Sequence, residues 1–174
     1  MKMKTGAEAL KWGDPSEAHT DVSAMIDRSN TERMTEWLEE AVKAGAEIVS
    51  GGFEKDGVFA PTIITQVEKE MRVCSEEVFG PIITIEAFDE FEEAIAMLND
   101  SKFGLQAGVY TDSISEMNLA FEKIECGGVI INDVPTFRVD HMPYGGIKDS
   151  GLGREGVKYA ILDMMEPRIL VKPK

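Results

Sequence analysis

The stretch from Pro81 to Ile131 reads PIITIEAFDEFEEAIAMLNDSKFGLQAGVYTDSISEMNLAFEKIECGGVII, and its patterning decides the fold class. The β-branched run over 81–85 predicts a short buried strand. Two amphipathic helical patterns then alternate with strand-like runs at 105–110 and 129–131. Helical crossovers of about 10–15 residues join parallel strands. The sequence therefore predicts an α/β fold, with a mainly parallel sheet and helices on both of its faces.

The same alternation continues outward from this stretch on both sides. Helices begin where a Ser or Asp precedes a Glu by three residues, because the two residues satisfy each other's free backbone amides. That spacing occurs at Ser29–Glu32, Asp89–Glu92 and Ser113–Glu116. The further predicted elements are a broken helix over 1–12, strands over 46–50, 58–65 and 168–171, and a last helix around 157–164.

Composition and charge exclude several classes of partner. The 174 residues hold 18 Lys and Arg against 32 Asp and Glu, which gives a net charge of −14. A chain this acidic repels phosphate backbones and anionic lipids, so we expect no nucleic-acid partner and no membrane. No apolar run approaches the roughly 20 residues of a membrane span. Two cysteines make no disulfide framework, and we therefore expect a cytoplasmic protein.

Two adjacent carboxylates, Glu76 and Glu77, precede the strand at 81–85. Carboxylates at the mouth of a parallel sheet can bind ribose hydroxyls or act as acid and base. Adjacent residues in an extended segment point to opposite sides, so we expect only one of the two to face such a site. The alternative is a solvated loop ahead of a buried strand, and the residues by themselves leave both interpretations open.

A second candidate is the segment over 143–156, which holds five glycines in fourteen residues. Glycine permits positive φ and close backbone approach, and such a loop at the start of a helix could hold an anion. The segment has neither the P-loop pattern nor the Gly-x-Gly-x-x-Gly dinucleotide fingerprint. A tight packing loop and a ligand-binding loop both remain open.

Neither cysteine has the surroundings of a nucleophile. A reactive thiol needs a base, positive charge nearby and access to substrate. Cys74 precedes two glutamates and Cys126 lies at a helix end before two glycines, so we expect buried, unreactive thiols rather than a thiol hydrolase. The histidines, His19 and His141, are far apart in the sequence and no zinc spacing occurs, so we expect no metal site.

Four stretches, in order along the chain, resemble motifs of the NAD(P)-dependent aldehyde dehydrogenases. They are Glu76-Glu77-Val78-Phe79-Gly80-Pro81, Asn99 to Val109, Gly127 to Asn132, and Pro143 to Glu155. The first is similar to the Glu-x-Phe-Gly-Pro motif of that family. The resemblance implies the C-terminal part of the aldehyde dehydrogenase catalytic domain over 1–165 and a terminal strand over 166–174 that bridges subunits.

The resemblance also implies roles for individual residues. Glu77 would hold the hydroxyls of the nicotinamide ribose, and Phe79 would pack against the nicotinamide. The aldehyde side would be lined by Asn132, Phe137, Arg138 and His141, and the tight loop beside it would be shaped by Gly145, Gly146 and Lys148.

The loop over 134–143 is most similar to the lactaldehyde or small-aldehyde branch of the family, whose members oxidise small hydroxy or phosphorylated aldehydes. The resemblance implies NAD or NADP as the cofactor of a complete enzyme, with none held tightly by this chain alone. It implies a small aldehyde as substrate. It also implies a homo-oligomer assembled through the C-terminal strand.

Two motifs of the family do not occur in these 174 residues, namely the Gly-Gln-x-Cys of the nucleophile and the Glu-Leu-Gly-Gly-Lys of the general base. The Rossmann-type cofactor domain has no counterpart either. We therefore expect no catalytic residue in this chain and no activity from it alone. The alternative function is a binding or assembly module that pairs with a complete subunit or with a separate N-terminal chain.

Overall fold

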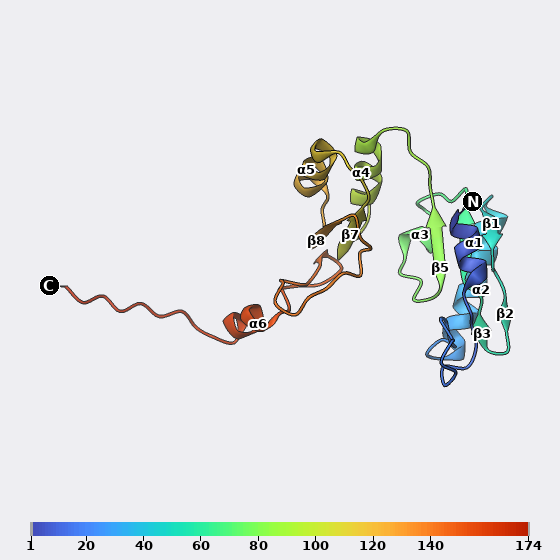
Figure 1. Ribbon diagram of the computed structural model, residues 1–174, viewed down its shortest axis with the longest axis horizontal. Coiled ribbons are helices and arrows are strands. Elements are labelled where there is room, and N and C mark those ends of the chain that lie inside the picture. The colour runs from blue at the N-terminus through green and yellow to red at the C-terminus, as the bar shows by residue number, and fades with distance from the viewer. Residues whose placement is uncertain (1, 174) are drawn as a thin grey trace. The chain divides into compact units, whose positions relative to one another are not determined.

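Helices and strands fall into two units along the chain, an N-terminal unit (Met1–Ala87) and a C-terminal unit (Phe88–Lys174) (Figure 1). The computed structural model describes residues 2–173. The N-terminal unit contains α1 (Lys2–Ala9), α2 (Arg28–Lys43), β1 (Glu47–Ser50), β2 (Glu54–Lys55), β3 (Val58–Phe59), β4 (Thr62–Thr65), α3 (Arg72–Ser75) and β5 (Ile82–Ile85). The C-terminal unit contains α4 (Phe91–Asn99), β6 (Phe103–Gly104), β7 (Gln106–Val109), α5 (Ile114–Lys123), β8 (Gly128–Ile131), β9 (Ile147–Lys148) and α6 (Val157–Asp163). The predicted α/β class is confirmed.

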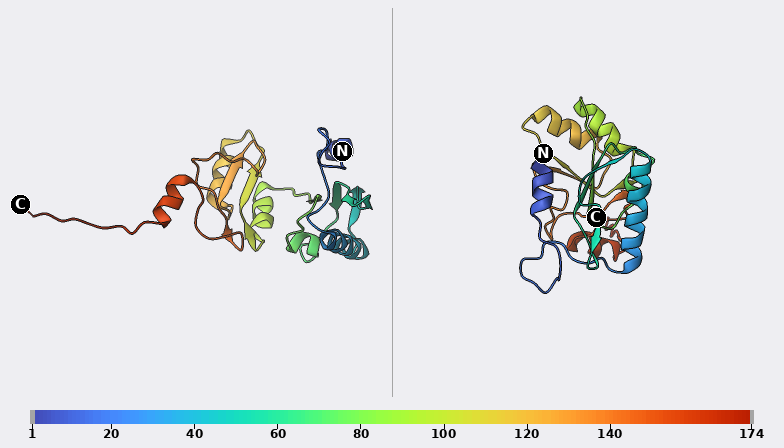
Figure 2. Two further views of the ribbon diagram at one scale, coloured as in Figure 1. Left: turned by 90° about the horizontal axis from the view of Figure 1, so that it is seen from below. Right: turned by 90° about the vertical axis from the view of Figure 1, so that its right-hand side faces the viewer.

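Helix α2 supplies the core of the N-terminal unit. Its buried residues recur at helical spacing and pack against the sheet and α3. The buried cluster comprises Met34, Trp37, Leu38, Ala41, Ala46, Phe59, Ile64, Met71 and Val73. Figure 2 shows α1 and α2 on opposite sides of the strands of this unit. The N-terminal sheet therefore has helices on both faces, as predicted.

The N-terminal sheet is mixed, with the strand order β1–β4–β5. Strands β4 and β5 are parallel, whereas β1 and β4 are antiparallel. The predicted strand over 58–65 is interrupted around Pro61, and β3 pairs instead with β2 through a turn at Asp56 and Gly57, both at positive φ. The prediction of parallel pairing is right for β4–β5 and wrong for β1. No helix lies between β1 and β4, so the chain returns antiparallel.

The predicted capping box of α2 is wrong. The N-cap is Asp27, whose carboxylate accepts hydrogen bonds from the Asn30 amide at 3.0 Å and the Ser29 hydroxyl at 2.6 Å. Asp27 has extended backbone angles, and its carboxylate reaches the free amides of the first turn without help from Glu32. Glu32 pairs instead with the side chain of Arg28.

The other two predicted boxes differ from each other. Helix α4 begins after Glu90 without a side-chain cap, and the Asp89 amide donates to Glu93, not to the predicted Glu92, at 3.1 Å. Helix α5 begins as predicted, because the Ser113 hydroxyl accepts from the Glu116 amide. The carboxylate of Glu116 does not return to Ser113 but accepts from the Thr111 hydroxyl, so that box is only half formed.

In the C-terminal unit, β7 and β8 form a parallel pair with α5 as their crossover. Helices α4 and α5 both pack against one face of this pair, where the buried residues are Ile95, Ala107, Val109, Ala120 and Ile124. The other face is covered by a loop, since a Cβ on Gly108 would lie 2.7 Å from the Asp133 carbonyl oxygen. Helices α4 and α5 therefore share one apolar surface, and the loop lies on the other face of this strand pair.

The long loop after β8 contains one short strand, β9, which pairs antiparallel with β6. Residues 165–173 form neither helix nor strand, so the strand predicted over 168–171 does not form within a single chain. The division at 166 and its bridging strand concern contacts between subunits and stay predictions. None of the helices between residues 2 and 173 has both the length and the apolarity to cross a membrane.

Candidate functional site

The N-terminal unit carries both residues predicted to contact a cofactor, in the turn between α3 and β5. Glu77 and Phe79 are exposed, and Val78 between them packs against the buried core. The ring of Phe79 is 67% exposed although it is a large apolar group. Side chains 77, 78 and 79 therefore alternate between solvent and core, so that the Glu77 carboxylate and the Phe79 ring both reach solvent.

The backbone of Phe79 has a φ of +51°, in the left-handed region. A non-glycine residue in this region costs about 1–3 kcal/mol, and the surrounding structure must hold it there. Strain of this kind at an exposed aromatic residue is typical of binding sites. It makes the turn a candidate for ligand contact.

The C-terminal unit carries the residues predicted for the aldehyde side. Asn132 follows β8 with a φ of +58°. Its side-chain carbonyl accepts a hydrogen bond from the Thr111 backbone amide at 2.9 Å, and its backbone amide donates to the Val109 carbonyl at 2.8 Å. Asn132 thus anchors the start of the loop to the carboxyl end of β7, and that anchoring is its contact in this structure.

The next part of the loop is held by Gln106 of β7. The amide nitrogen of its side chain donates to the Pro135 carbonyl at 2.6 Å and to the Phe137 carbonyl at 3.3 Å. The side chain of Phe137 is partly exposed. The two carbonyls bond the same side-chain nitrogen, so Gln106 sets the path of the loop across this face of β7.

Arg138 is oriented by two neighbours within the C-terminal unit. Its guanidinium donates to the Glu155 carboxylate at 2.9 Å and lies 4.4 Å from the centre of the Tyr144 ring. His141 is exposed, three residues further along. The loop therefore presents one fixed cation and one exposed imidazole.

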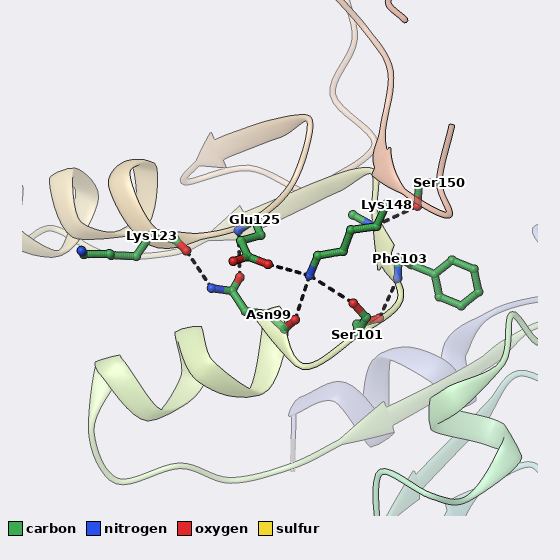
Figure 3. A network of polar contacts seen from close by, with 8 residues as sticks. Asn99, Ser101, Phe103, Lys123, Glu125, Lys148 and Ser150 are labelled. Carbon is green, nitrogen blue, oxygen red and sulfur yellow. Dashed lines mark hydrogen bonds and ion pairs between the residues drawn. The ribbon is translucent and has the colours of Figure 1, made fainter. Parts of the chain in front are cut away.

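The predicted loop residue Lys148 has a structural role that is plain in Figure 3. Its ammonium group donates to the carbonyls of Asn99 at 2.8 Å and Ser101 at 3.1 Å, and it pairs with Glu125 at 2.9 Å. The Asn99 side chain completes the network, because it bonds the Lys123 carbonyl and the Glu125 amide. The network ties β9 to the ends of α4 and α5.

The two predicted glycines lie where backbones approach closely. A Cβ on Gly146 would lie 2.3 Å from the Ser150 Cβ, and a Cβ on Gly127 would lie 1.7 Å from the Gly145 oxygen. An open hollow of about 480 Å³ adjoins them, lined by Leu105, Tyr144, Gly145, Gly146, Ser150, Gly151, Leu152, Arg154, Glu155 and Asp163. Asn132, Phe137, Arg138 and His141 do not line this hollow.

Both thiols are free and only partly buried, contrary to the prediction that they are buried. Burial raises the pKa of the Cys74 thiol, and the nearby Glu86 carboxylate raises it further. The Cys126 sulfur donates to the Gly128 carbonyl at 3.0 Å. Within residues 2–173, no three His, Cys, Asp or Glu side chains gather as a metal ion would need.

The sequence predicted no loop contact for Gln106, Gly108 or Gly127, although all three hold the loop in place. Gln106 and Gly108 belong to the stretch from Asn99 to Val109, and Gly127 opens the stretch up to Asn132. The signal was present, because a Gln and a Gly are unusual inside a short buried strand. Such residues point to a backbone or loop packed directly on the strand.

Comparison with known proteins gives consistent results. The family model described as "Aldehyde dehydrogenase family" matches residues 1–170. The 3-sulfolactaldehyde dehydrogenase of Priestia aryabhattai is 49% identical over 171 residues, which are 98% of this chain and 36% of that protein. The chain thus spans about a third of the length of the curated relatives it matches.

Solved structures give the same result. Aldehyde dehydrogenase 21 from Physcomitrella patens, in complex with the reaction product succinate, superposes with a TM-score of 0.91 and 42% identity over 93% of this chain and 34% of its own. Glyceraldehyde-3-phosphate dehydrogenase from Methanocaldococcus jannaschii, complexed with NADP, has a TM-score of 0.89 and 38% identity over 94% and 35%. By its fold, its motifs and these matches, the chain belongs to the aldehyde dehydrogenase family.

Proposed function

We propose that this chain supplies the nicotinamide side and the aldehyde side of an aldehyde dehydrogenase site. The complete enzyme would oxidise a small aldehyde to a carboxylic acid with NAD or NADP. The observation that carries the proposal is the turn in which Glu77 and Phe79 are both exposed while Val78 is packed inward. That turn matches the family's Glu-x-Phe-Gly-Pro motif residue by residue.

The residues of this turn fit a nicotinamide nucleotide. The Glu77 carboxylate can accept hydrogen bonds from both hydroxyls of a ribose. The exposed ring of Phe79 offers an apolar surface for a flat heterocycle. The bound cofactor would supply an acceptor for the hydride of the aldehyde. The role of the chain itself would be to bind the cofactor and to orient its nicotinamide ring.

The aldehyde side supports a substrate with an anionic substituent. The relatives named above act on a sulfonated aldehyde, act on a phosphorylated aldehyde, or hold a dicarboxylate product. Arg138 is the cation of the loop, and its pairing with Glu155 and Tyr144 fixes its position. A small hydroxy aldehyde with an anionic end is the substrate class that we propose.

We further propose that the 174 residues are catalytically incomplete. The family mechanism needs a thiolate that attacks the aldehyde and a base that activates water for the second half-reaction. Burial raises the pKa of Cys74, and Cys126 donates to a backbone carbonyl, so neither thiol suits the role. Loss of a covalent nucleophile leaves only residual rates.

The test uses the purified chain with NAD or NADP and three aldehydes, namely lactaldehyde, succinate semialdehyde and glyceraldehyde 3-phosphate. We expect no reduced cofactor above the enzyme-free rate. A titration with nicotinamide mononucleotide, followed by NMR, then compares the chain with its Glu77→Gln variant. Weaker binding by the variant supports the proposal. Turnover that disappears on alkylation of the cysteines contradicts catalytic incompleteness, and equal binding contradicts the role of Glu77.

The second candidate function is assembly through the C-terminal segment. Ile169, Leu170 and Val171 are adjacent, apolar and 87%, 91% and 77% exposed, in a segment that forms neither helix nor strand by itself. Strand edges recruit other strands, so a second copy or a complete subunit can pair there. Light scattering of the chain and of a variant truncated at 165 tests this, because a monomer in both cases rules it out.

The two free thiols favour a reducing, cytoplasmic location.

A further inference from the structure

The turn that exposes Glu77 and Phe79 is tethered from a distant helix. One terminal guanidinium nitrogen of Arg33, in α2, donates to the Val78 carbonyl at 2.7 Å across a sequence separation of 45 residues. Val78 is the residue between the two predicted cofactor contacts. A charged donor on that single carbonyl restrains the peptide that links Val78 to Phe79, because hydrogen bonds to ionised groups are the strong ones.

Met34, the residue after Arg33, packs against the same turn. Met34 is fully buried, and a Cβ on Gly80 would lie 1.9 Å from its sulfur. No other side chain fits at position 80 without displacing Met34. Two consecutive residues of α2 therefore contact the turn on both sides of Phe79, one by a hydrogen bond and one by direct packing.

Arg33 is itself held in place before it reaches the turn. Its guanidinium carbon lies 5.3 Å from the centre of the Trp37 ring, and Arg72 stacks on the same ring at 5.2 Å. Arg72 donates to the carboxylates of Glu36 and Glu40, which belong to α2 as well. Contact with the ring reduces the freedom of the Arg33 side chain, so the hydrogen bond to Val78 needs less further ordering.

We propose that Arg33 is a positioning residue for the nicotinamide side of the site. It acts through the Val78 carbonyl, and it keeps Phe79 in the left-handed conformation that leaves Glu77 and Phe79 exposed together. This inference rests on the proposed function of those two residues. Without the tether, the backbone of Phe79 relaxes toward negative φ, and the carboxylate and the ring no longer share one orientation.

The matched variants are Arg33→Met and Arg72→Met, each of which removes one guanidinium from the Trp37 ring. Of the two side chains, that of Arg33 donates to the turn and that of Arg72 donates to Glu36 and Glu40, so Arg72→Met is the control for loss of charge and of ring stacking. Arg33→Lys keeps the charge and loses the planar fork. The Nε of Arg33 is buried and has no hydrogen-bond partner within residues 2–173, so its removal offsets part of the loss. We expect the melting temperature to change by less than about 4 °C.

The first readout is the backbone order parameter of residues 77–80 by nitrogen-15 relaxation. In the unmodified chain we expect about 0.85, the value of a rigid backbone, and in Arg33→Met less than about 0.6. Helix α2 and β4 should stay unchanged, and Arg72→Met should match the unmodified chain. Unchanged order parameters and amide shifts at 77–80 in Arg33→Met overturn the proposal, as does an equal effect of Arg72→Met. Should Arg33→Met not fold, Arg33→Lys is measured in its place against the same criteria.

The second readout separates this inference from the proposed function. Nicotinamide mononucleotide is titrated into the unmodified chain, Arg33→Met and Glu77→Gln. We expect binding to weaken at least about fivefold in both variants, while Glu77→Gln keeps the order parameters of the unmodified chain. If Glu77→Gln binds as well as the unmodified chain, the proposed role of Glu77 fails, and the order parameters still decide whether Arg33 holds the turn.

Discussion

Substitution of Gly127 by alanine tests the packing that places the glycine-rich loop. An added Cβ would lie 1.7 Å from the Gly145 carbonyl oxygen, about 1.7 Å short of ordinary contact, which begins at 3.4 Å. The oxygen is a backbone atom and the backbone fixes the position of the Cβ, so no rotamer change relieves the overlap. The Gly127 amide also donates to the carbonyls of Gly104 and Leu105 at 3.0 Å, and a shift of the strand would weaken these bonds.

The magnitude follows from these two terms. Overpacking by one methyl group costs about 1–3 kcal/mol, and one weakened backbone hydrogen bond adds about 1 kcal/mol. We therefore expect Gly127→Ala to lower the free energy of unfolding of the C-terminal unit by about 2–4 kcal/mol. With a denaturant slope of about 1–3 kcal/mol per molar urea, the midpoint should fall by roughly 1 M or more.

The sequence provides a separate reporter for each unit. Both tryptophans, Trp12 and Trp37, lie in the N-terminal unit, and all three tyrosines lie in the C-terminal unit, at 110, 144 and 159. Urea unfolding of Gly127→Ala should shift the tyrosine transition and leave the tryptophan transition in place.

The neighbouring Gly128→Ala variant is the matched control. Its added Cβ would lie 2.9 Å from the Gln106 side-chain oxygen, so a small shift of that side chain relieves the overlap without moving backbone, although it weakens the bonds of Gln106 to the Pro135 and Phe137 carbonyls. We expect it to cost less than about 1 kcal/mol. Tyrosine transitions of the two variants that agree within about 0.5 kcal/mol would refute the reasoning from backbone overlap.

Three further predictions concern charge and thiol chemistry. The pKa of Asp27 is lowered by hydrogen bonds from Ser29 and Asn30, and the pKa of Glu40 is lowered by the bond from Arg72. Both carboxylates therefore stabilise the folded N-terminal unit at pH values above their ordinary pKa values of 3.8 and 4.5. This stability should be lost as the pH falls through the lower folded pKa values, and tryptophan emission against pH at fixed urea measures it. Because burial raises the pKa of Cys74, a Cys126→Ser variant should react with iodoacetamide at neutral pH more slowly than free cysteine, and an equal rate would contradict the burial argument. Lys148→Met should destabilise the C-terminal unit by about 1–3 kcal/mol, because the Lys148 side chain is only 24% exposed and its ammonium group bonds two carbonyls, and the tyrosine transition reports this.

Most element positions could be read from the sequence, because they depend on local periodicity. The apolar spacing of Met34, Trp37, Leu38 and Ala41 determines the buried face of α2 without knowledge of its partner. The helix starts were predicted less well. Several acceptors compete for the same free amides at a helix start, and Asp27 reaches those of α2 before Ser29 does.

The candidate site shows the same division. Glu77, Phe79 and the loop after β8 could be named from contiguous motifs, because each motif is a short run of sequence. Their surroundings could not be named, since Gln106 contacts the loop about 30 residues away and Arg33 contacts Val78 from 45 residues away. Contacts at such separations leave no periodic trace in a single sequence.

By itself the sequence determined the α/β class, the order of the elements, the acidic surface and the residues that match the family motifs. These depend on local patterns of polarity and on side-chain chemistry, which a linear chain displays in full. Only the tertiary structure decided how β1 pairs, which face of β7 and β8 the loop covers, and what holds the turn at Phe79 in its left-handed conformation. Close packing decides these features, because a buried methionine sulfur or a carbonyl oxygen leaves room for one backbone path only.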